Sequence, residues 1–140
     1  EKLKILIVNN RNLQAIYLYE GIVFPITPEK QRWYNDLNSK SGYEIKASFD
    51  KITPQGVDEK KVDIGIAVDI ISLGYENVYD TAVLVSGDGD FLPVVKKLKE
   101  MGKNVEIWAF RYSLANALKD ELEQGKIHYF EDILSKIKIN

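Results

Sequence analysis

One stretch of this chain places a short apolar run, a glycine-rich turn and a helical pattern in direct succession. The apolar run covers residues 81–85, the turn covers residues 86–90, and apolar residues at helical spacing follow over residues 91–98. An apolar run of this length before such a turn and helix is typical of a buried strand in a parallel sheet. This order restricts the possible folds to the α/β class more strongly than any other feature.

Strand and helix patterns alternate along the rest of the chain. Strands are predicted over residues 13–19, 43–49, 80–85, 104–110 and 126–130. Helices are predicted from Pro28 until the pattern fades by Gly42, and over residues 58–73, 91–101, 114–122 and 131–137. Thr27 and Ser113 have the residue type of helix N-caps, and residues 52–56 are predicted to form a loop. Such alternation predicts a mostly parallel sheet with helices on both faces.

Length and composition exclude several kinds of protein. The 140 residues are enough for one domain with a hydrophobic core, and a formal net charge of −2 gives no general attraction to nucleic acids. The chain has no cysteine and a single histidine, His128, which excludes disulfides, a cysteine nucleophile and a histidine metal cluster. Because no membrane-spanning run or signal peptide is visible, we expect a cytoplasmic protein without a membrane partner.

Two carboxylates follow the predicted buried strand, those of Asp88 and Asp90. Open α/β sheets bind ligands beyond the carboxyl ends of their strands, and Gly87 and Gly89 allow a close approach to the turn. Neighbouring carboxylates repel each other unless a cation lies between them, and such hard oxygen ligands suit Mg²⁺ or Mn²⁺. The structural alternative is that Asp-Gly is ordinary turn chemistry and that Asp90 only caps the following helix.

A second group of polar residues interrupts the predicted helix 58–73. Asp63 lies near its beginning, where a carboxylate either stabilises the helix dipole or points into the same cleft as Asp88 and Asp90. Asp69 lies on a different face and is expected to pair with a lysine or to lie at the edge of the cleft. Lys60 and Lys61 either form a solvated face or contact a phosphate.

Three segments together resemble the NYN, or LabA-like, branch of the PIN-domain superfamily. They are KVDIGIAVD at residues 61–69, YDTAVLVSGDGDF at residues 79–91 and GKNVE at residues 102–106, and Ser113 and Leu114 resemble a further family motif. The resemblance implies a Rossmann-like, three-layer PIN fold and, for many members, metal-dependent cleavage of RNA. Carried over by position, Asp63, Asp88 and Asp90 are the expected catalytic and metal-binding residues, with Mg²⁺ or Mn²⁺ as cofactor and Ser86 as a supporting polar group.

The expected partner is RNA in single-stranded form. A homodimer is also consistent with the sequence. Lys60, Lys61 and Ser86 are the expected substrate-binding residues. Further basic candidates by position are Arg32, Lys103 and Arg111, and Trp33 and Tyr34 are candidates for stacking on bases, although core packing is the commoner role of such rings.

The beginning of the chain departs from the family pattern, which starts with a strand ending in an aspartate. One interpretation makes residues 3–8 that strand, with Asn9 where the aspartate belongs. The other makes residues 1–8 the end of a helix, and we prefer it because too few residues separate Asn12 from the strand at Ala15 for a parallel crossover. Since the first residue is Glu1, we expect a single domain over residues 1–140 that is incomplete at its amino end.

Three functions are consistent with this sequence. The first is a metal-dependent ribonuclease that hydrolyses phosphodiester bonds. The second is a non-catalytic RNA-binding or scaffold domain on the same fold, which the missing first-strand aspartate favours. The third is a receiver-like or phosphatase-like domain, which ranks last because no acceptor aspartate is visible on an early strand.

Overall fold

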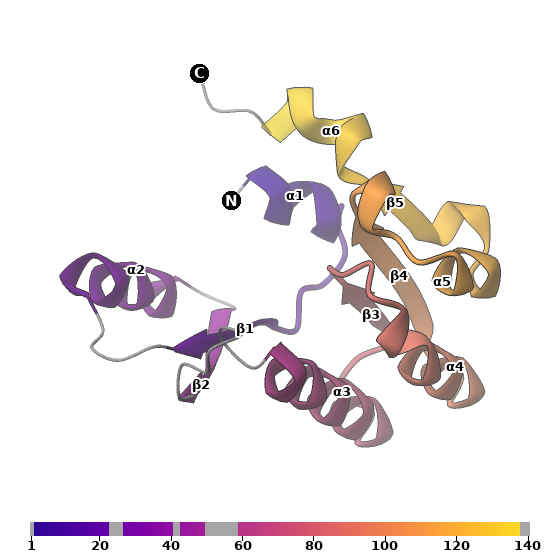
Figure 1. Cartoon of the computed structure of the whole chain (residues 1–140), viewed down its shortest axis with the longest axis horizontal. Helices are drawn as coiled ribbons and strands as arrows, with labels where there is room; N and C mark the ends of the chain where they lie inside the picture. The colour runs from indigo at the N-terminus through magenta and orange to yellow at the C-terminus, as the bar shows by residue number, and fades with distance from the viewer. Residues whose placement is uncertain (1, 23–26, 41–42, 50–58, 138–140) are drawn as a thin grey trace. The chain divides into compact units, whose positions relative to one another are not determined.

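The computed structural model describes residues 2–22, 27–40, 43–49 and 59–137 (Figure 1). The chain divides into two compact units, one formed by Glu1–Arg11 and Ile70–Asn140 and the other by Asn12–Asp69. We call them unit 1 and unit 2. Each unit has its own sheet, and every strand pair in the described residues is parallel. The predicted parallel α/β organisation is therefore confirmed, whereas the extent of a single domain over residues 1–140 stays a prediction.

Unit 2 contains a two-stranded sheet and the helix that connects its strands. Strand β1 (Ile16–Ile22) pairs with β2 (Tyr43–Phe49), and helix α2 (Pro28–Ser39) lies between them in the chain. The side chain of Thr27 accepts a hydrogen bond of 3.2 Å from the Lys30 amide, and Pro28 occupies the first turn. The predicted capped start of this helix is therefore confirmed, and β2 has the predicted bounds. Strand β1 begins three residues later than predicted.

Helix α3 (Glu59–Tyr75) contributes residues to both units, since the division falls between Asp69 and Ile70. It ends where Asn77 adopts a left-handed φ of 61°, which allows the Val78 amide to bond back to the carbonyl of Leu73. The chain then continues within unit 1. The predicted loop over residues 52–56, which precedes this helix, lies outside the described residues.

Unit 1 contains a three-stranded sheet in the order β3–β4–β5. The strands are β3 (Thr81–Leu84), β4 (Asn104–Ala109) and β5 (Ile127–Tyr129). Leu84 is in register with Ile107, and Ile107 with Ile127. Because the strands are parallel and in this register, the loops that follow β3, β4 and β5 all leave from one edge of the sheet.

Helices cover both faces of this sheet. In Figure 1, α4 (Leu92–Glu100) and α5 (Asn116–Glu121) lie on one side, and α1 (Lys2–Val8) and α6 (Phe130–Ile137) lie on the other. Short 3₁₀ turns join these elements: η1 (Gly89–Phe91), η2 (Arg111–Ser113) and η3 (Gln124–Lys126). Unit 1 by itself therefore has the helix–sheet–helix layering that the alternating pattern predicts.

The core of unit 1 lies around the central strand β4. Val105, Ile107 and Ala109 alternate along it and are at most 3% exposed, as expected for a strand whose alternate side chains face a helical layer. Trp108, on the opposite face, is also buried at 5% exposure. Each large side chain buried in this way contributes about 1.5–3 kcal/mol relative to an exposed one. Burial on both faces places β4 in the middle of the fold.

The first described residues form a helix, so the interpretation of residues 3–8 as a strand is wrong. Helix α1 ends at Val8, and Asn9 and Asn10 follow with left-handed φ angles of 47° and 65°, a conformation that asparagine tolerates well. Arg11 then makes two contacts with the carboxylate of Glu106 on β4, at 2.6 and 3.2 Å. This ion pair attaches the end of α1 to the central strand. The predicted helical interpretation of this segment is therefore confirmed.

Candidate functional site

The turn after β3 is organised by its own polar side chains. The Ser86 hydroxyl accepts a hydrogen bond of 3.2 Å from the Asp88 amide, and the Asp88 carboxylate accepts one of 2.9 Å from the Asp90 amide. Asp88 is therefore the cap of η1, so the alternative that Asp90 caps the following helix is wrong. Both carboxylates are exposed at the surface of this turn. The polar groups of the turn thus hold two negative charges at the carboxyl edge of the sheet.

The two glycines of the turn allow the chain segment after β4 to pack against it. A Cβ atom at Gly87 would lie 2.6 Å from the carbonyl carbon of Ser113 and 2.9 Å from Cα of Leu114. A Cβ atom at Gly89 would lie 3.1 Å from that of Ala115, and the Ala115 amide donates a hydrogen bond of 2.9 Å to the Gly87 carbonyl. Only glycine fits at position 87, because the neighbouring atoms belong to the backbone.

Ser113 does not cap the next helix as predicted. It lies in η2, its hydroxyl donates to the carbonyl of Phe110 at 3.0 Å, and α5 begins at Asn116 without a side-chain cap. A serine before a helix usually indicates an N-cap, but here the serine hydroxyl bonds to the preceding turn instead. Its backbone packs against Gly87 and so joins the loop after β4 to the acidic turn.

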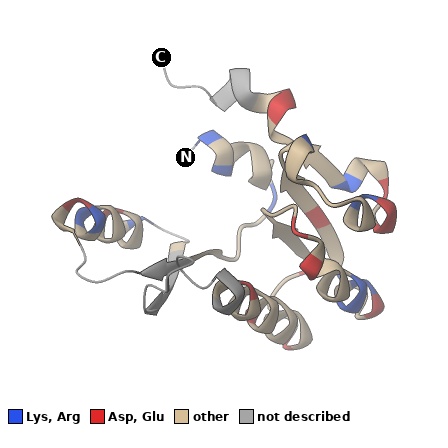
Figure 2. Ribbon diagram, in the orientation of Figure 1, with Lys and Arg blue, Asp and Glu red and all other residues tan. Residues whose placement is uncertain are grey.

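The loop after β4 is also held from the side of β5. The Arg111 amide donates to the Glu131 carboxylate at 2.8 and 3.1 Å, and the Arg111 guanidinium pairs with Asp132 at 2.9 Å to both oxygens. The guanidinium also lies 4.4 Å from the ring centroid of Tyr129. Figure 2 shows acidic residues both in the turn after β3 and at the beginning of α6. Glu131 and Asp132 were not among the predicted site residues, although parallel strands alone imply that their loops share one edge.

The remaining predicted site residues lie on α3. Asp63 is half-buried and belongs to unit 2, whereas Asp88 and Asp90 belong to unit 1, so the convergence of the three carboxylates stays a prediction. Lys60 and Lys61 lie in the first turn of α3, and their side chains lie outside the described residues. The Asp69 carboxylate accepts a hydrogen bond of 2.7 Å from the Tyr19 hydroxyl, a partner that the sequence does not indicate.

The chemistry of the turn suits a hard cation. One oxygen of Asp88 is occupied by the Asp90 amide, which leaves its second oxygen and the whole carboxylate of Asp90 facing solvent within the described structure. Carboxylate oxygens of this kind are the ligands that Mg²⁺ and Mn²⁺ prefer. Among the residues that the structure describes, no three His, Cys, Asp or Glu side chains gather into a group that could hold a metal ion.

The further basic and aromatic candidates are mostly engaged in local contacts. Lys103 bonds to the side chain of Asn77, and Arg32 lies 3.7 Å from Glu29 one turn away on the same helix. Tyr34 is 6% exposed and packs in the core of unit 2, whereas Trp33 is 44% exposed. Of these two rings, only Trp33 is accessible for stacking, and Lys30 lies 4.6 Å from its centroid.

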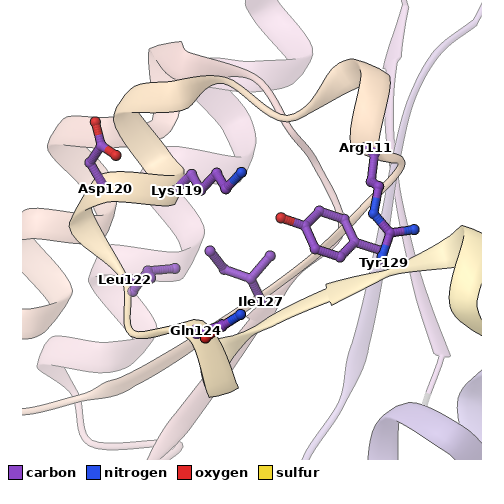
Figure 3. Close-up of a pocket in the computed structure, with 7 residues that line it drawn as sticks. All are labelled: Arg111, Lys119, Asp120, Leu122, Gln124, Ile127 and Tyr129. Carbon is purple, nitrogen blue, oxygen red and sulfur yellow. The ribbon is translucent and has the colours of Figure 1, made fainter.

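A pocket of about 440 Å³ opens between α5 and β5. It is lined by Arg111, Lys119, Asp120, Leu122, Gln124, Ile127 and Tyr129. In Figure 3 the Lys119 side chain and the Tyr129 hydroxyl point toward each other across the pocket, while the Asp120 carboxylate points away. None of the predicted catalytic residues lines this pocket, so the acidic turn lies outside it.

Comparison with known proteins identifies the family. The profile of the NYN domain matches residues 1–129. The chain belongs to the NYN domain family. NYN domains have a nuclease-like fold and generally bind RNA, and the nucleases among them generally use divalent metal ions. The suspected relationship to the NYN branch of the PIN-domain superfamily is therefore confirmed.

Two individual proteins are similar to this NYN domain. The uncharacterised protein MJ0482 of Methanocaldococcus jannaschii is 33% identical over 82 residues, which are 56% of this chain and 34% of that protein. The chain thus spans about a third of the length of that relative. The crystal structure of VPA0982, a protein of unknown function from Vibrio parahaemolyticus, matches with a TM-score of 0.67 at 22% identity and covers 84% of this chain and 69% of that one. This similarity confirms the α/β fold.

Within the described ranges, no helix is both long enough and apolar enough to cross a bilayer. The predicted cytoplasmic location stays a prediction.

Proposed function

We propose that this NYN domain is a metal-dependent ribonuclease that hydrolyses phosphodiester bonds in single-stranded RNA. The observation that carries the proposal is the exposed pair of carboxylates, Asp88 and Asp90, in a rigid turn at the carboxyl edge of a parallel sheet. Family membership supports it, because NYN domains have a nuclease-like fold. Ligands of open α/β sheets bind at this edge.

The proposed roles follow from the position of each group. Asp88 and Asp90 would hold Mg²⁺ or Mn²⁺, and Asp63 would complete the set. When bound, the metal supplies an activated water and stabilises charge on the leaving oxygen. The Ser86 hydroxyl, which accepts from the Asp88 amide, keeps its own hydrogen for donation to a phosphate oxygen. Lys60 and Lys61 would bind flanking phosphates.

The deciding experiment follows the cleavage of an end-labelled single-stranded RNA in Mn²⁺, in Mg²⁺ and in EDTA. Asp88→Asn is a sharp variant here, because asparagine caps a helix about as well as aspartate and the turn should survive while one charge is lost. We expect Asp88→Asn and Asp90→Asn to reduce the rate by more than about 100-fold, since even groups one shell away from a metal typically cost 10–100-fold.

Asp80→Asn is the matched control. Asp80 is exposed and lies just before β3, at the opposite end of the same strand from the acidic turn. The same chemical change there should leave cleavage unaltered. Cleavage that persists in EDTA, or that both turn variants retain, would overturn the proposal.

A second candidate function is RNA binding without cleavage. It is favoured by the capping role of Asp88, which gives this carboxylate a structural use, and by the absence of a three-ligand group among the described residues. In that case the wild type binds RNA but leaves it intact in Mn²⁺, and Asp90→Asn changes affinity alone. Replacing Lys60 and Lys61 together should then reduce the slope of log affinity against log salt by about 1.4, if each contacts one phosphate of a single strand. Lys96 and Lys97 on α4 are a matched control pair.

A further inference from the structure

Among the described residues at the carboxyl edge of the unit 1 sheet, the most exposed aromatic side chain is that of Tyr112. It is 85% exposed, and its ring is stacked on that of Phe110 with 5.4 Å between centroids and 22° between planes. Phe110 packs in turn on the buried Phe130 at 5.0 Å. One face of the Tyr112 ring therefore rests on an aromatic layer that is anchored in the core.

The backbone that carries Tyr112 is fixed on both sides. Glu131 accepts from the amide of the preceding residue, Arg111, and the Ser113 amide bonds back to the carbonyl of Phe110 at 3.1 Å. On the other side, the Ala115 amide bonds to Gly87 at 2.9 Å. An exposed ring on a rigid loop loses little conformational freedom when it binds a flat partner.

The same contacts place the loop that carries this ring next to the acidic turn. Ser113 follows Tyr112 and packs against Gly87, which precedes Asp88. An RNA strand whose phosphate binds at Asp88 and Asp90 would therefore pass the loop that carries Tyr112. Because the guanidinium of Arg111 is already paired with Asp132, this loop attracts its partner through the aromatic ring rather than through charge.

We propose that Tyr112, supported by Phe110, is a stacking platform for one unpaired base of the RNA strand next to the cleavage point. This inference rests on the proposed ribonuclease function and adds a base-binding position to it. Stacking on aromatic rings accepts every base, so the platform would position single-stranded RNA without selecting its sequence. Double-stranded RNA, whose bases are stacked on each other, would not engage it.

The test measures the binding of a single-stranded RNA that carries 2-aminopurine, a base whose fluorescence is quenched by stacking, in EDTA to prevent cleavage. Tyr112→Ala should weaken binding by between about 5-fold and 150-fold and should abolish the quenching, whereas Tyr112→Trp should retain both. The salt dependence of affinity should be unchanged in Tyr112→Ala, because no ionic contact is lost.

Tyr75→Ala is the matched control. Tyr75 is 83% exposed and belongs to the same unit, but it ends α3 before β3 begins and so lies toward the other edge of the sheet. It should bind RNA like the wild type. If the wild type binds and Tyr112→Ala binds and quenches equally well, the platform is refuted while RNA binding stands. If the wild type neither binds single-stranded RNA at low salt in EDTA nor cleaves it in Mn²⁺, the proposed function itself fails.

Discussion

At the scale of single residues, Gly87 is the position where the fold tolerates least change. We expect Gly87→Ala to reduce the free energy of unfolding by about 1–3 kcal/mol, because its Cβ would overlap backbone atoms of Ser113 that cannot turn away. The measurement is a urea unfolding midpoint at constant m-value. Gly125→Ala is the control, since nothing lies within 4 Å of a Cβ atom there. Equal midpoints for the two variants would show that the loops separate easily.

A second residue-scale prediction concerns Tyr79, whose hydroxyl donates to the carbonyl of Ile70. Burial raises the pKa of Tyr79 to about 12 from its ordinary value near 10. Between these two values the unfolded chain has released the proton and the folded chain still holds it, so stability falls as pH rises through this window.

Tyr79→Phe isolates this contribution. At pH 8 the variant should be less stable by about 1 kcal/mol through loss of the hydrogen bond. That difference from the wild type should shrink as the pH rises from 10 to 12, because only the wild type pays for releasing this proton. Urea midpoints at pH 8 and pH 11 measure it, and a constant difference at both pH values would contradict the assignment.

At the scale of elements, an ion pair links the end of α1 to β4. The Arg11–Glu106 pair is two-pronged and its carboxylate side chain is only 13% exposed, although the 40% exposure of Arg11 lets water screen part of it. A double-mutant cycle with Arg11→Ala and Glu106→Gln should give a coupling of about 1–2 kcal/mol. The exposed Lys97–Glu100 pair, at 55% and 71% exposure, should give less than about 0.5 kcal/mol. Similar couplings for both pairs would refute a special role for Arg11.

Most elements could be predicted because their signals are local. Thr27 and Pro28 define the start of α2 through a cap that depends on adjacent residues, and Gly102, with a φ of 79°, defines the end of α4. Residues 3–8 are apolar enough for a strand or a helix, so the local pattern leaves both possible. The segment is attached to the sheet by the contact between Arg11 and Glu106, which are far apart in the sequence. The prediction that Ser113 caps a helix is wrong for the same reason. Its residue type fits a cap, but in the fold its backbone packs against Gly87, which is distant in the sequence.

At the scale of the whole molecule, the predicted metal-binding residues belong to different units: Asp63 to unit 2, and Asp88 and Asp90 to unit 1. The sequence identifies Asp88 and Asp90 through their place after a buried strand, and the structure explains their turn. The sequence could not predict that Asp88 would cap η1, because either aspartate satisfies the same local pattern. The sequence also does not single out Glu131 and Asp132, whose contacts with Arg111 depend on β5 lying next to β4.

Metal binding offers a test of whether the units act together. If Asp63 and Asp88 share one ion, Mn²⁺ should raise the melting temperature of the wild type, and Asp63→Asn and Asp88→Asn should each reduce that rise. The double variant should lose little more than either single one, because one site can be lost only once. Asp80→Asn should respond like the wild type. A melting temperature that millimolar Mn²⁺ leaves unchanged, or an additive double variant, would show that the two carboxylates serve no common ion.

The attachment of α1 also has a consequence for the order in which the chain can fold during synthesis. Arg11 and Glu106 are 95 positions apart, and Asn12–Asp69, the whole of unit 2, lies between them. At about 5–20 residues per second, a ribosome needs roughly 5–20 s to reach Glu106 after Arg11. Throughout that interval α1 lacks the β4 residue that it pairs with, whereas all residues of unit 2 are made before the interval ends. Helix α1 is therefore translated well before β4 but can dock on that strand only after Glu106 has been made.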